Sequence, residues 1–362
     1  MARAVVALAV MGIVIAGSGC RTVPKVATTP VFFPAPPDPP RVQYLRAFST
    51  RSDVAHKYSW VDWLVGPSEA GRTGFLKPYG LAVTRGKFYL CDTIPGTVWV
   101  VDFARGNFQP IAGDRRQGKL RKPINVVIDA DGKKYVADVE RGEIVVFGSD
   151  DEYVTAFGQG EDLKPTDLAI AGDQMILTDL NKHEIQVRDK HTGKLVRAFG
   201  SPESAGLDES VGQPTNIALD TQGNILVSDA GRFRISAFSR EGSFQGSFGQ
   251  IGRQAGQFAR PKGIAVDRAG RIYVVDAAFE NVQIFDDQHR LLMWFGGHGS
   301  DEGSLVLPAQ IVINYDNPDY FRKYVAPGYD LDCVIWVTSQ DGPRKVSCFG
   351  LLQPKSPETT RK

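Results

Sequence analysis

The chain has 362 residues, and its 42 Lys and Arg against 41 Asp and Glu give a formal net charge of +1. Because basic and acidic residues are nearly equal in number, we expect no overall electrostatic attraction to nucleic acid. The 42% of hydrophobic residues can fill a large interior, and 38 glycines with 22 prolines suit a fold built from turns and short strands.

The N-terminal residues have the pattern of an export signal. Arg3 precedes an apolar stretch over residues 4–16, which is too short to span a bilayer comfortably as a permanent helix. The following Gly17 to Cys20 resembles a bacterial lipobox, with glycine where leucine is usual. We predict a lipoprotein-type signal peptide over residues 1–19 and lipidation of Cys20, which would anchor the protein to a membrane. Ordinary signal cleavage near Ser18 is the alternative.

A Pro-rich segment comes next, and we predict an extended, semi-rigid tether over residues 20–40. Arg21 after the cysteine is similar to lipoproteins sent to an outer membrane, so we expect the outer membrane of a Gram-negative-type envelope. Residues 41–49, RVQYLRAFS, have the pattern of a last strand without its preceding strands. The connection after it contains Trp60 and Trp63, which we expect to pack over one face of the fold or to bind a partner.

One pattern then recurs six times, opening with Pro78, Pro123, Pro165, Pro214, Pro261 and Pro308. These prolines follow one another at intervals of 45, 42, 49, 47 and 47 residues. In five copies an aspartate comes 14 or 15 residues later, at Asp92, Asp138, Asp179, Asp229 and Asp276. Each copy contains three short apolar runs separated by turn residues, and a fourth run ends in Phe-Gly in most copies. This is the pattern of short β-strands.

Four strands in each of six units predict an all-β fold, a six-bladed β-propeller over residues 41–352. An open solenoid is the rival. The last copy lacks a fourth strand, and residues 41–49 supply one, so we expect the N-terminal strand to close the ring. The polar tail, residues 353–362, is predicted to be disordered.

The six copies resemble NHL repeats. Five of them carry the P-x-[GND]-[IVL]-[AV]-[VIL] opening and the aspartate that ends a strand. The chain from PPRVQYL onward, residues 39–350, is similar to predicted bacterial NHL-repeat lipoproteins. This resemblance implies a non-catalytic binding or scaffold module for a protein or an anionic partner, in an electron-transfer assembly with a multihaem cytochrome. NHL propellers include lyases and RNA binders as well, so the fold alone does not fix the function.

The repeated aspartates are predicted to be structural. They occur once per unit at a strand end, where a short carboxylate accepts hydrogen bonds from the amides of the next turn. Catalytic groups break repeat symmetry, whereas scaffold residues obey it. In the sixth copy Ser339 stands in place of the aspartate.

The position two residues after each proline varies, and in a closed propeller it would ring one mouth of the central channel: Gly80, Asn125, Asp167, Asn216, Gly263 and Gln310. The oxygens of Asp167, Asn125, Asn216 and Gln310 are of the kind that calcium prefers, so we expect no cofactor, with calcium at these residues as the alternative. Polar groups that face a water-filled channel need no metal and are the alternative. The ring resembles the metal ligands of gluconolactonase and paraoxonase propellers, which implies a metal-dependent hydrolase or lyase as the second reading.

Basic residues flank the same prolines: Lys77, Arg121, Lys122, Lys164, Arg260 and Lys262. We predict that they form a basic rim on one face of the disc that binds anionic groups. Scattered surface charges are the alternative. The five histidines occupy no repeated position that would gather a zinc ion, and there is no G-x-S-x-G motif.

The sixth copy contains an insertion over residues 314–332, with Tyr315, Tyr320, Phe321, Tyr324 and Tyr329. Long loops on rigid repeats commonly carry function, so we predict that this insertion binds a protein partner. Cys333 and Cys348 flank the next hairpin in diagonal positions, which leaves both a disulfide and two free thiols open. Cys91 is expected to be a small core residue.

Overall fold

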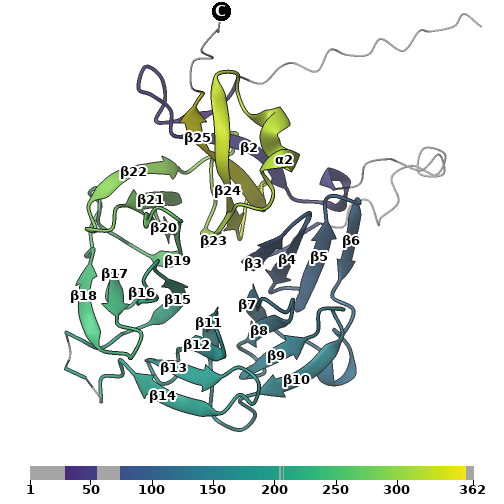
Figure 1. Ribbon diagram of the computed structural model, residues 1–362, viewed down its shortest axis with the longest axis vertical. Helices are drawn as coiled ribbons and strands as arrows, with labels where there is room; N and C mark the ends of the chain where they lie inside the picture. Colours follow the sequence, from purple (N-terminus) through teal and green to yellow (C-terminus); the bar gives the residue numbers. More distant parts are fainter. Residues whose placement is uncertain (1–28, 55–73, 204, 207, 356–362) are drawn as a thin grey trace, which may run out of the picture.

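The computed structural model describes residues 29–54, 74–203, 205–206 and 208–355. Six antiparallel sheets stand around a ring, each with one strand nearest the centre (Figure 1). These innermost strands are β3 (Pro78–Thr84), β7 (Pro123–Ile128), β11 (Pro165–Ala171), β15 (Pro214–Leu219), β19 (Pro261–Val266) and β23 (Pro308–Asn314). Each begins at the proline of one repeat copy. The predicted six-bladed β-propeller is therefore confirmed.

Blades one to five each contain four strands, ordered from the centre outward as in the sequence. In blades one and two the outer strands are β4 (Lys87–Asp92), β5 (Thr97–Asp102), β6 (Asn107–Pro110), β8 (Lys134–Asp138), β9 (Glu143–Phe147) and β10 (Tyr153–Phe157). In blades three and four they are β12 (Gln174–Asp179), β13 (Glu184–Asp189), β14 (Leu195–Phe199), β16 (Ile225–Asp229), β17 (Arg234–Phe238) and β18 (Phe244–Phe248). In blade five they are β20 (Ile272–Asp276), β21 (Asn281–Phe285) and β22 (Leu291–Gly296).

Blade six is closed by the N-terminal strand, as predicted. Outward from β23 it contains β24 (Tyr329–Ser339), β25 (Val346–Pro354) and β2 (Val42–Phe48). Strand β2 pairs antiparallel with β25, and Tyr44 lies opposite Phe349. The two ends of the chain thereby satisfy each other's backbone groups, which removes two open sheet edges. Strand β25 also includes residues 353 and 354 of the predicted tail.

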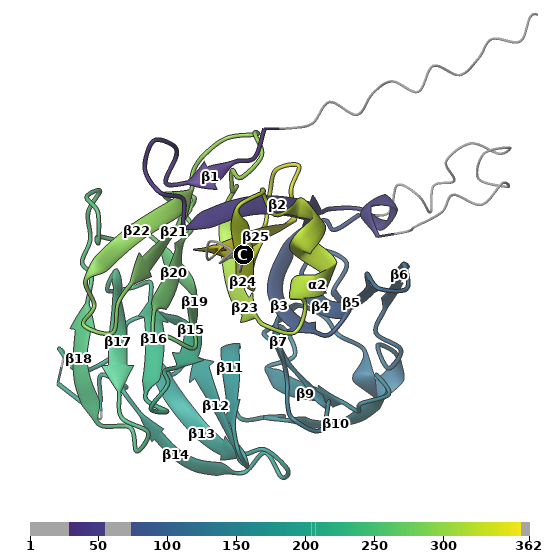
Figure 2. The same ribbon diagram turned by 45° about the horizontal axis from the view of Figure 1, so that its top comes forward.

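A fifth strand extends blade six outward. Strand β1 (Phe32–Phe33) pairs antiparallel with β2, and the ring of Phe33 lies 6.1 Å from that of Phe295 and 6.2 Å from that of Phe349. Residues 31–34 of the predicted tether are therefore half-buried on the propeller, whereas residues 35–39 are exposed (Figure 2). The reason is the apolar Val31 and Phe33, which join the hydrophobic cluster between blades five and six.

Several sequence predictions lie outside the described residues: the signal peptide over residues 1–19, Cys20, Trp60 and Trp63, and residues 356–362. Two short 3-10 helices, η1 (Arg51–Asp53) and η3 (Arg116–Gly118), lie in connections between blades. Within the described ranges, no helix is long and apolar enough to cross a membrane.

The hydrophobic core is divided among the junctions of neighbouring blades. The junction of blades six and one contains Trp336, which is 0% exposed and stacks on Phe48 with ring centroids 5.9 Å apart. Its ring also lies 5.6 Å from Phe88 and 5.3 Å from Phe321. Burial of each large apolar side chain contributes roughly 1.5 to 3 kcal/mol. Because Phe48 comes from β2, this packing also fixes the strand that closes the ring.

The five repeated aspartates are each 0% exposed and tie the end of one strand to the chain that approaches the blade. In blade five, Asp276 accepts backbone N–H groups from Ala259 at 2.7 Å, Arg260 at 3.1 Å and Ala278 at 2.9 Å. A buried carboxylate is stable when several donors face it. The structural role predicted for these residues is confirmed.

Blade six divides this task between two residues. Ser339 Oγ accepts the backbone N–H of Val306 at 3.3 Å, and Glu280 Oε1 of blade five accepts that of Leu307 at 3.0 Å. A hydroxyl is too small to accept from both amides as a carboxylate does. Glu280 therefore supplies the acceptor that the missing aspartate would have given.

The cysteines of blade six lie on opposite faces of their sheet. Cys333 packs with Ile335 in the cluster toward blade five, and Cys348 packs with Val346 in the cluster toward blade one. Both are free and buried, as is Cys91, the core residue that the sequence predicts. Of the two alternatives for Cys333 and Cys348, the structure shows free thiols.

Candidate functional site

The polar residues two positions after each proline form a packed layer at the centre of the disc. Asn125, Asp167 and Asn216 are 2%, 1% and 0% exposed. The pairing register of each of these three inner strands shifts between the proline and the polar residue, as at a β-bulge. Side chains this deeply buried do not fit the alternative of polar groups that face a water-filled channel.

Asp167 is the centre of this layer. Its Oδ1 accepts the side-chain amide of Asn125 and, at 2.7 Å, the backbone N–H of Leu168. Its Oδ2 accepts Asn216 Nδ2 at 3.2 Å and the backbone N–H of Ile217 at 3.1 Å. Burial raises the pKa of Asp167 to about 6, although all four hydrogen bonds act in the opposite direction. One carboxylate therefore joins blades two, three and four.

Gln310 and the two glycines of the ring lie apart from Asp167. Gln310 Oε1 accepts the backbone N–H of Ile311 at 3.1 Å, and Gln310 N donates to Thr338 Oγ1 at 3.0 Å. A Cβ atom at Gly263 would lie 2.7 Å from the Cα of Gln310, so only glycine fits there. The structure thus brings together three of the four calcium-ligand candidates. Among the described residues, no three His, Cys, Asp or Glu side chains form a metal-binding cluster.

The basic residues beside the prolines share one face of the disc, because the innermost strands all begin there. We call this the rim face. The backbone N–H groups of Lys77, Lys122 and Lys164 donate to the buried aspartates of their blades at 2.8, 3.0 and 3.1 Å. The backbones of Arg121 and Arg260 are held in the same way. Main-chain bonds thus fix where these residues stand and leave their side chains free.

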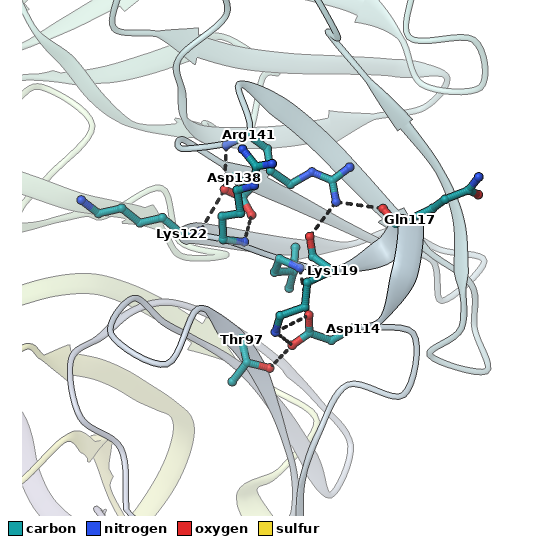
Figure 3. A network of polar contacts seen from close by, with 9 residues as sticks. Thr97, Asp114, Gln117, Lys119, Lys122, Asp138 and Arg141 are labelled. Atoms are coloured by element: carbon teal, nitrogen blue, oxygen red, sulfur yellow. Dashed lines mark hydrogen bonds and ion pairs between the residues drawn. The ribbon is translucent and has the colours of Figure 1, made fainter.

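None of the six basic-rim side chains forms an ion pair within the described part of the chain. Other cations of the same blade are neutralised. Figure 3 shows Lys119 bound to Asp114 at 3.1 Å and Arg141 bound to backbone carbonyls, while the side chain of Lys122 points away from this network. Arg141 also pairs with Glu143 at 2.5 Å. The side chains of the basic rim are therefore without ion pairs among the described residues.

Tyr79 is a member of this face that sequence reasoning missed. Lys262 Nζ donates to Tyr79 Oη at 2.8 Å, and the ammonium lies 5.4 Å from the ring centroid. This contact joins blades five and one across the start of blade six. Tyr79 and Lys262 each directly follow the proline of their repeat copy. This shared position was the signal in the sequence that could have identified Tyr79.

The aromatic insertion of blade six lies on the opposite face, because it follows the far end of β23. It contains α2 (Pro318–Phe321) and η4 (Arg322–Tyr324). Phe321, predicted to bind a partner, is 1% exposed and packs on Trp336, so here the prediction is corrected: the side chain belongs to the core. Its burial seals the junction of blades six and one.

The other aromatic residues of the insertion are also used within the fold. Tyr315 Oη accepts the backbone N–H of Arg268 at 3.1 Å, and Tyr324 Oη accepts from Arg46 at 3.1 Å. The ring of Tyr329 lies 5.9 Å from that of Phe32. Tyr320 is the most accessible of the five, at 39% exposed. Partner binding by the insertion therefore remains a prediction for Tyr320 above all.

Comparison with known proteins shows which of them resemble this chain in sequence or in fold. No family model matches the chain. A segment of 141 residues, 37% of the chain, is 24% identical to Protein brain tumor of Drosophila melanogaster and spans only 13% of that protein's length. The structure of this chain is that of a six-bladed β-propeller. What the longer fly protein does as a whole is not carried over to this chain, which matches so small a part of it.

Solved structures share the fold at low identity. A Bacteroides thetaiotaomicron protein of unknown function gives a TM-score of 0.60 with 14% identity, over 86% of this chain and 76% of that one. A gluconolactonase from Xanthomonas campestris gives 0.56 with 14% identity, over 90% and 98%. Virginiamycin B lyase from Staphylococcus aureus gives 0.53 with 13% identity, over 76% and 95%. The functions of these propellers differ, so the likeness shows the fold alone.

Proposed function

We propose that this propeller is a non-catalytic binding module that holds an anionic partner on its rim face. The observation that supports this is the basic rim, whose side chains surround the channel mouth without ion pairs among the described residues. Because buried aspartates fix the backbones of all of them except Lys262, the positions from which these charges extend are set before binding. A protein with clustered carboxylates is the partner class. A multihaem cytochrome, with its haem propionates, is one such partner.

The test reverses the rim charge without touching the fold. Lys77, Lys122, Lys164 and Arg260 are changed together to Glu, and binding of a polyglutamate peptide and of a multihaem c-type cytochrome is measured by calorimetry. We expect affinity to fall by at least about tenfold, and wild-type affinity to fall steeply between about 50 and 200 mM salt. If the charge-reversed protein binds both probes as the wild type does, the basic rim is not the site.

A matched control carries the same change of charge on the opposite face. The loops there contain Arg85, Arg105, Lys194 and Arg240, all exposed. Reversal of these four to Glu should leave affinity within about twofold of wild type, because they lie farther from the mouth than a Debye length of about 8 Å. If both variants lost the same affinity for the probes, the probes would be attracted by the net charge of the whole protein rather than by the rim face.

We propose further that the protein is exported and anchored through a lipid on Cys20. The apolar stretch before this cysteine and the similarity to a lipobox support the proposal. Expression of a Cys20→Ser variant tests it by fractionation. The wild type should sediment with outer membranes and the variant should not, whereas equal membrane fractions would rule out the anchor.

A second function, a metal-dependent hydrolase or lyase, is favoured by one observation. Asn216 Oδ1 is buried in the central layer and has no hydrogen-bond partner in the described structure. A calcium ion would take this oxygen, Asn125 and Asp167, although the amide donors on Asp167 would first have to turn away. Stoichiometric calcium in the purified protein, lost in Asp167→Ala together with lactone hydrolysis, would support this function. Metal-free wild-type protein that hydrolyses no lactone would exclude it.

A further inference from the structure

The residue directly after each repeat proline lies at the rim-face end of an innermost strand. The six are Tyr79, Ile124, Thr166, Thr215, Lys262 and Ala309. The hydroxyl of Thr166 donates to the carbonyl of Pro214 at 3.0 Å. That of Thr215 donates to the carbonyl of Ser228 at 3.2 Å. Because isoleucine and alanine have no polar side-chain group, only the tyrosine and the lysine of this set keep donors for a ligand.

These two residues contact each other. Lys262 Nζ donates to Tyr79 Oη at 2.8 Å, which uses one of the three N–H groups of the ammonium. The phenol oxygen accepts in this bond, so its own O–H is still a donor, and the described residues give that O–H no acceptor. A hydrogen bond received from a cation makes a hydroxyl a stronger donor. The free hydrogens of both groups therefore lie close enough to reach one group of a ligand.

The backbone on both sides of this contact is held by packing. The carbonyl of Tyr79 accepts Thr338 Oγ1 of blade six at 2.6 Å. Each member of the pair is followed by a glycine that lies against the next inner strand. A Cβ atom at Gly80 would lie 2.4 Å from the backbone of β7, and one at Gly263 would lie 2.7 Å from that of β23. The strands that carry the two donors are thus fixed before a ligand arrives.

Lys262 also differs from most of the basic rim in its exposure. It is half-buried, whereas four other residues of the rim are exposed: Lys77, Arg121, Lys122 and Arg260. Exposed charges attract an anion over a distance but hold it loosely. A half-buried ammonium beside a phenol makes a directed, charge-assisted hydrogen bond.

We infer that Lys262 and Tyr79 together bind one carboxylate group of the anionic partner, the ammonium on one oxygen and the phenol O–H on the other. The inference rests on the proposed function, which brings an acidic partner to the rim face. Two adjacent donors match the two oxygens of a carboxylate. A neutral carbonyl has a single acceptor oxygen and no charge. A phosphate group has a third oxygen, for which the other residues at this strand position have no free donor.

The test compares polyglutamate with a phosphoserine peptide of the same net charge, each titrated into the full chain by calorimetry. Tyr79→Phe removes the phenol O–H and keeps the ring and the charge of the protein. We expect it to weaken polyglutamate about tenfold, because a hydrogen bond to a charged group is lost. The salt dependence of that affinity should not change, and the phosphoserine peptide should lose less than about twofold.

The charged member of the pair has its own matched control. Lys262→Gln should weaken polyglutamate by at least about tenfold, because the ammonium that contacts the carboxylate is gone. Lys122→Gln removes the same charge from an exposed side chain beside another repeat proline. It should weaken both peptides equally, by about threefold or less, because it lowers only the general attraction.

Two results would overturn the inference: Tyr79→Phe that binds polyglutamate as the wild type does, and Tyr79→Phe that weakens both peptides equally. The charge-reversed rim variant keeps Tyr79 and Lys262, so it tests the proposed function separately. Loss of affinity in that variant without loss in Tyr79→Phe would refute the carboxylate pair and leave the rim. Loss in Tyr79→Phe without loss in that variant would refute the rim and leave the pair.

Discussion

Asn216 of blade four donates its side-chain amide to the carboxylate of Asp167 in blade three, at 3.2 Å. Asn125 of blade two does the same from the other side. Adjacent blades of this propeller are therefore joined at the centre by a polar contact as well as by the apolar junctions. The contact involves one buried carboxyl group, so the stability that this group contributes should respond to pH.

Asp167 should make stability depend on pH. Burial raises the pKa of Asp167 from 3.8 to about 6, so the folded chain holds this proton more tightly than the unfolded chain. The contribution is fully present below pH 3.8 and is lost as the pH rises through 6. Wild type should exceed Asp167→Asn in unfolding free energy by roughly 2 kcal/mol more at pH 4 than at pH 7, measured in urea.

The exposed Asp301→Asn is the control for this measurement, because Asp301 lies in a loop and its side chain forms no ion pair within the described residues. Its difference from wild type should not change across this pH range. A constant difference for Asp167→Asn as well would contradict the raised pKa.

Removal of a repeated aspartate should destabilise the whole disc. Asp276→Ala leaves the amides of Ala259, Arg260 and Ala278 without their acceptor, at about 1 to 3 kcal/mol for each buried group. We expect a total loss of roughly 3 to 5 kcal/mol in urea unfolding, limited by the relaxation of the loop. A loss below about 1 kcal/mol would mean that water replaces the carboxylate.

The junction of blades six and one should be sensitive to cavities. Trp336→Ala removes a fully buried ring that contacts Phe48, Phe88 and Phe321, and we expect a loss of about 3 to 5 kcal/mol. Trp294→Ala removes the same side chain from a half-exposed site and should cost less than about 1 kcal/mol. Thermal unfolding of the two variants checks the order, and equal losses would contradict the packing described for Trp336.

The thiols of blade six should be free and unreactive in the folded protein. Burial raises the pKa of Cys348 well above its usual range and that of Cys333 to about 12, so little thiolate is present at neutral pH. Iodoacetamide should label Cys91, Cys333 and Cys348 only after unfolding, as read by mass spectrometry. A mass two hydrogens lower, restored by a reductant, would instead show a disulfide.

Much of the fold could be predicted from the sequence because the same turn and strand signals recur in successive repeat copies. The proline at the start of each inner strand and the aspartate at the end of the next were readable as turn and strand signals. Ring closure followed from one orphan strand and one incomplete copy. The packing of β1 could not be predicted, since two phenylalanines in a Pro-rich segment give no strand pattern. Their stability comes from tertiary contacts, Phe32 with Tyr329 and Phe33 with Phe295 and Phe349.

The candidate site was only partly predictable. The positions of the basic residues beside each proline put them on one face, but whether Lys122 is free or paired depends on where Asp114, Glu143 and their neighbours lie. Phe321 and Tyr320 are adjacent in the sequence, and only packing makes one a core residue and the other accessible.

By itself, the amino-acid sequence determined the number of blades, their strands and the residue that ends each one, because these depend on local backbone preferences repeated every forty to fifty residues or so. The tertiary structure alone decided which polar groups meet an acceptor. It joined Asn125 and Asn216 to Asp167, left the basic rim without ion pairs among the described residues, and buried Phe321 while Tyr320 stayed accessible. Such contacts form between residues that are distant in the sequence, so no local sequence pattern predicts them.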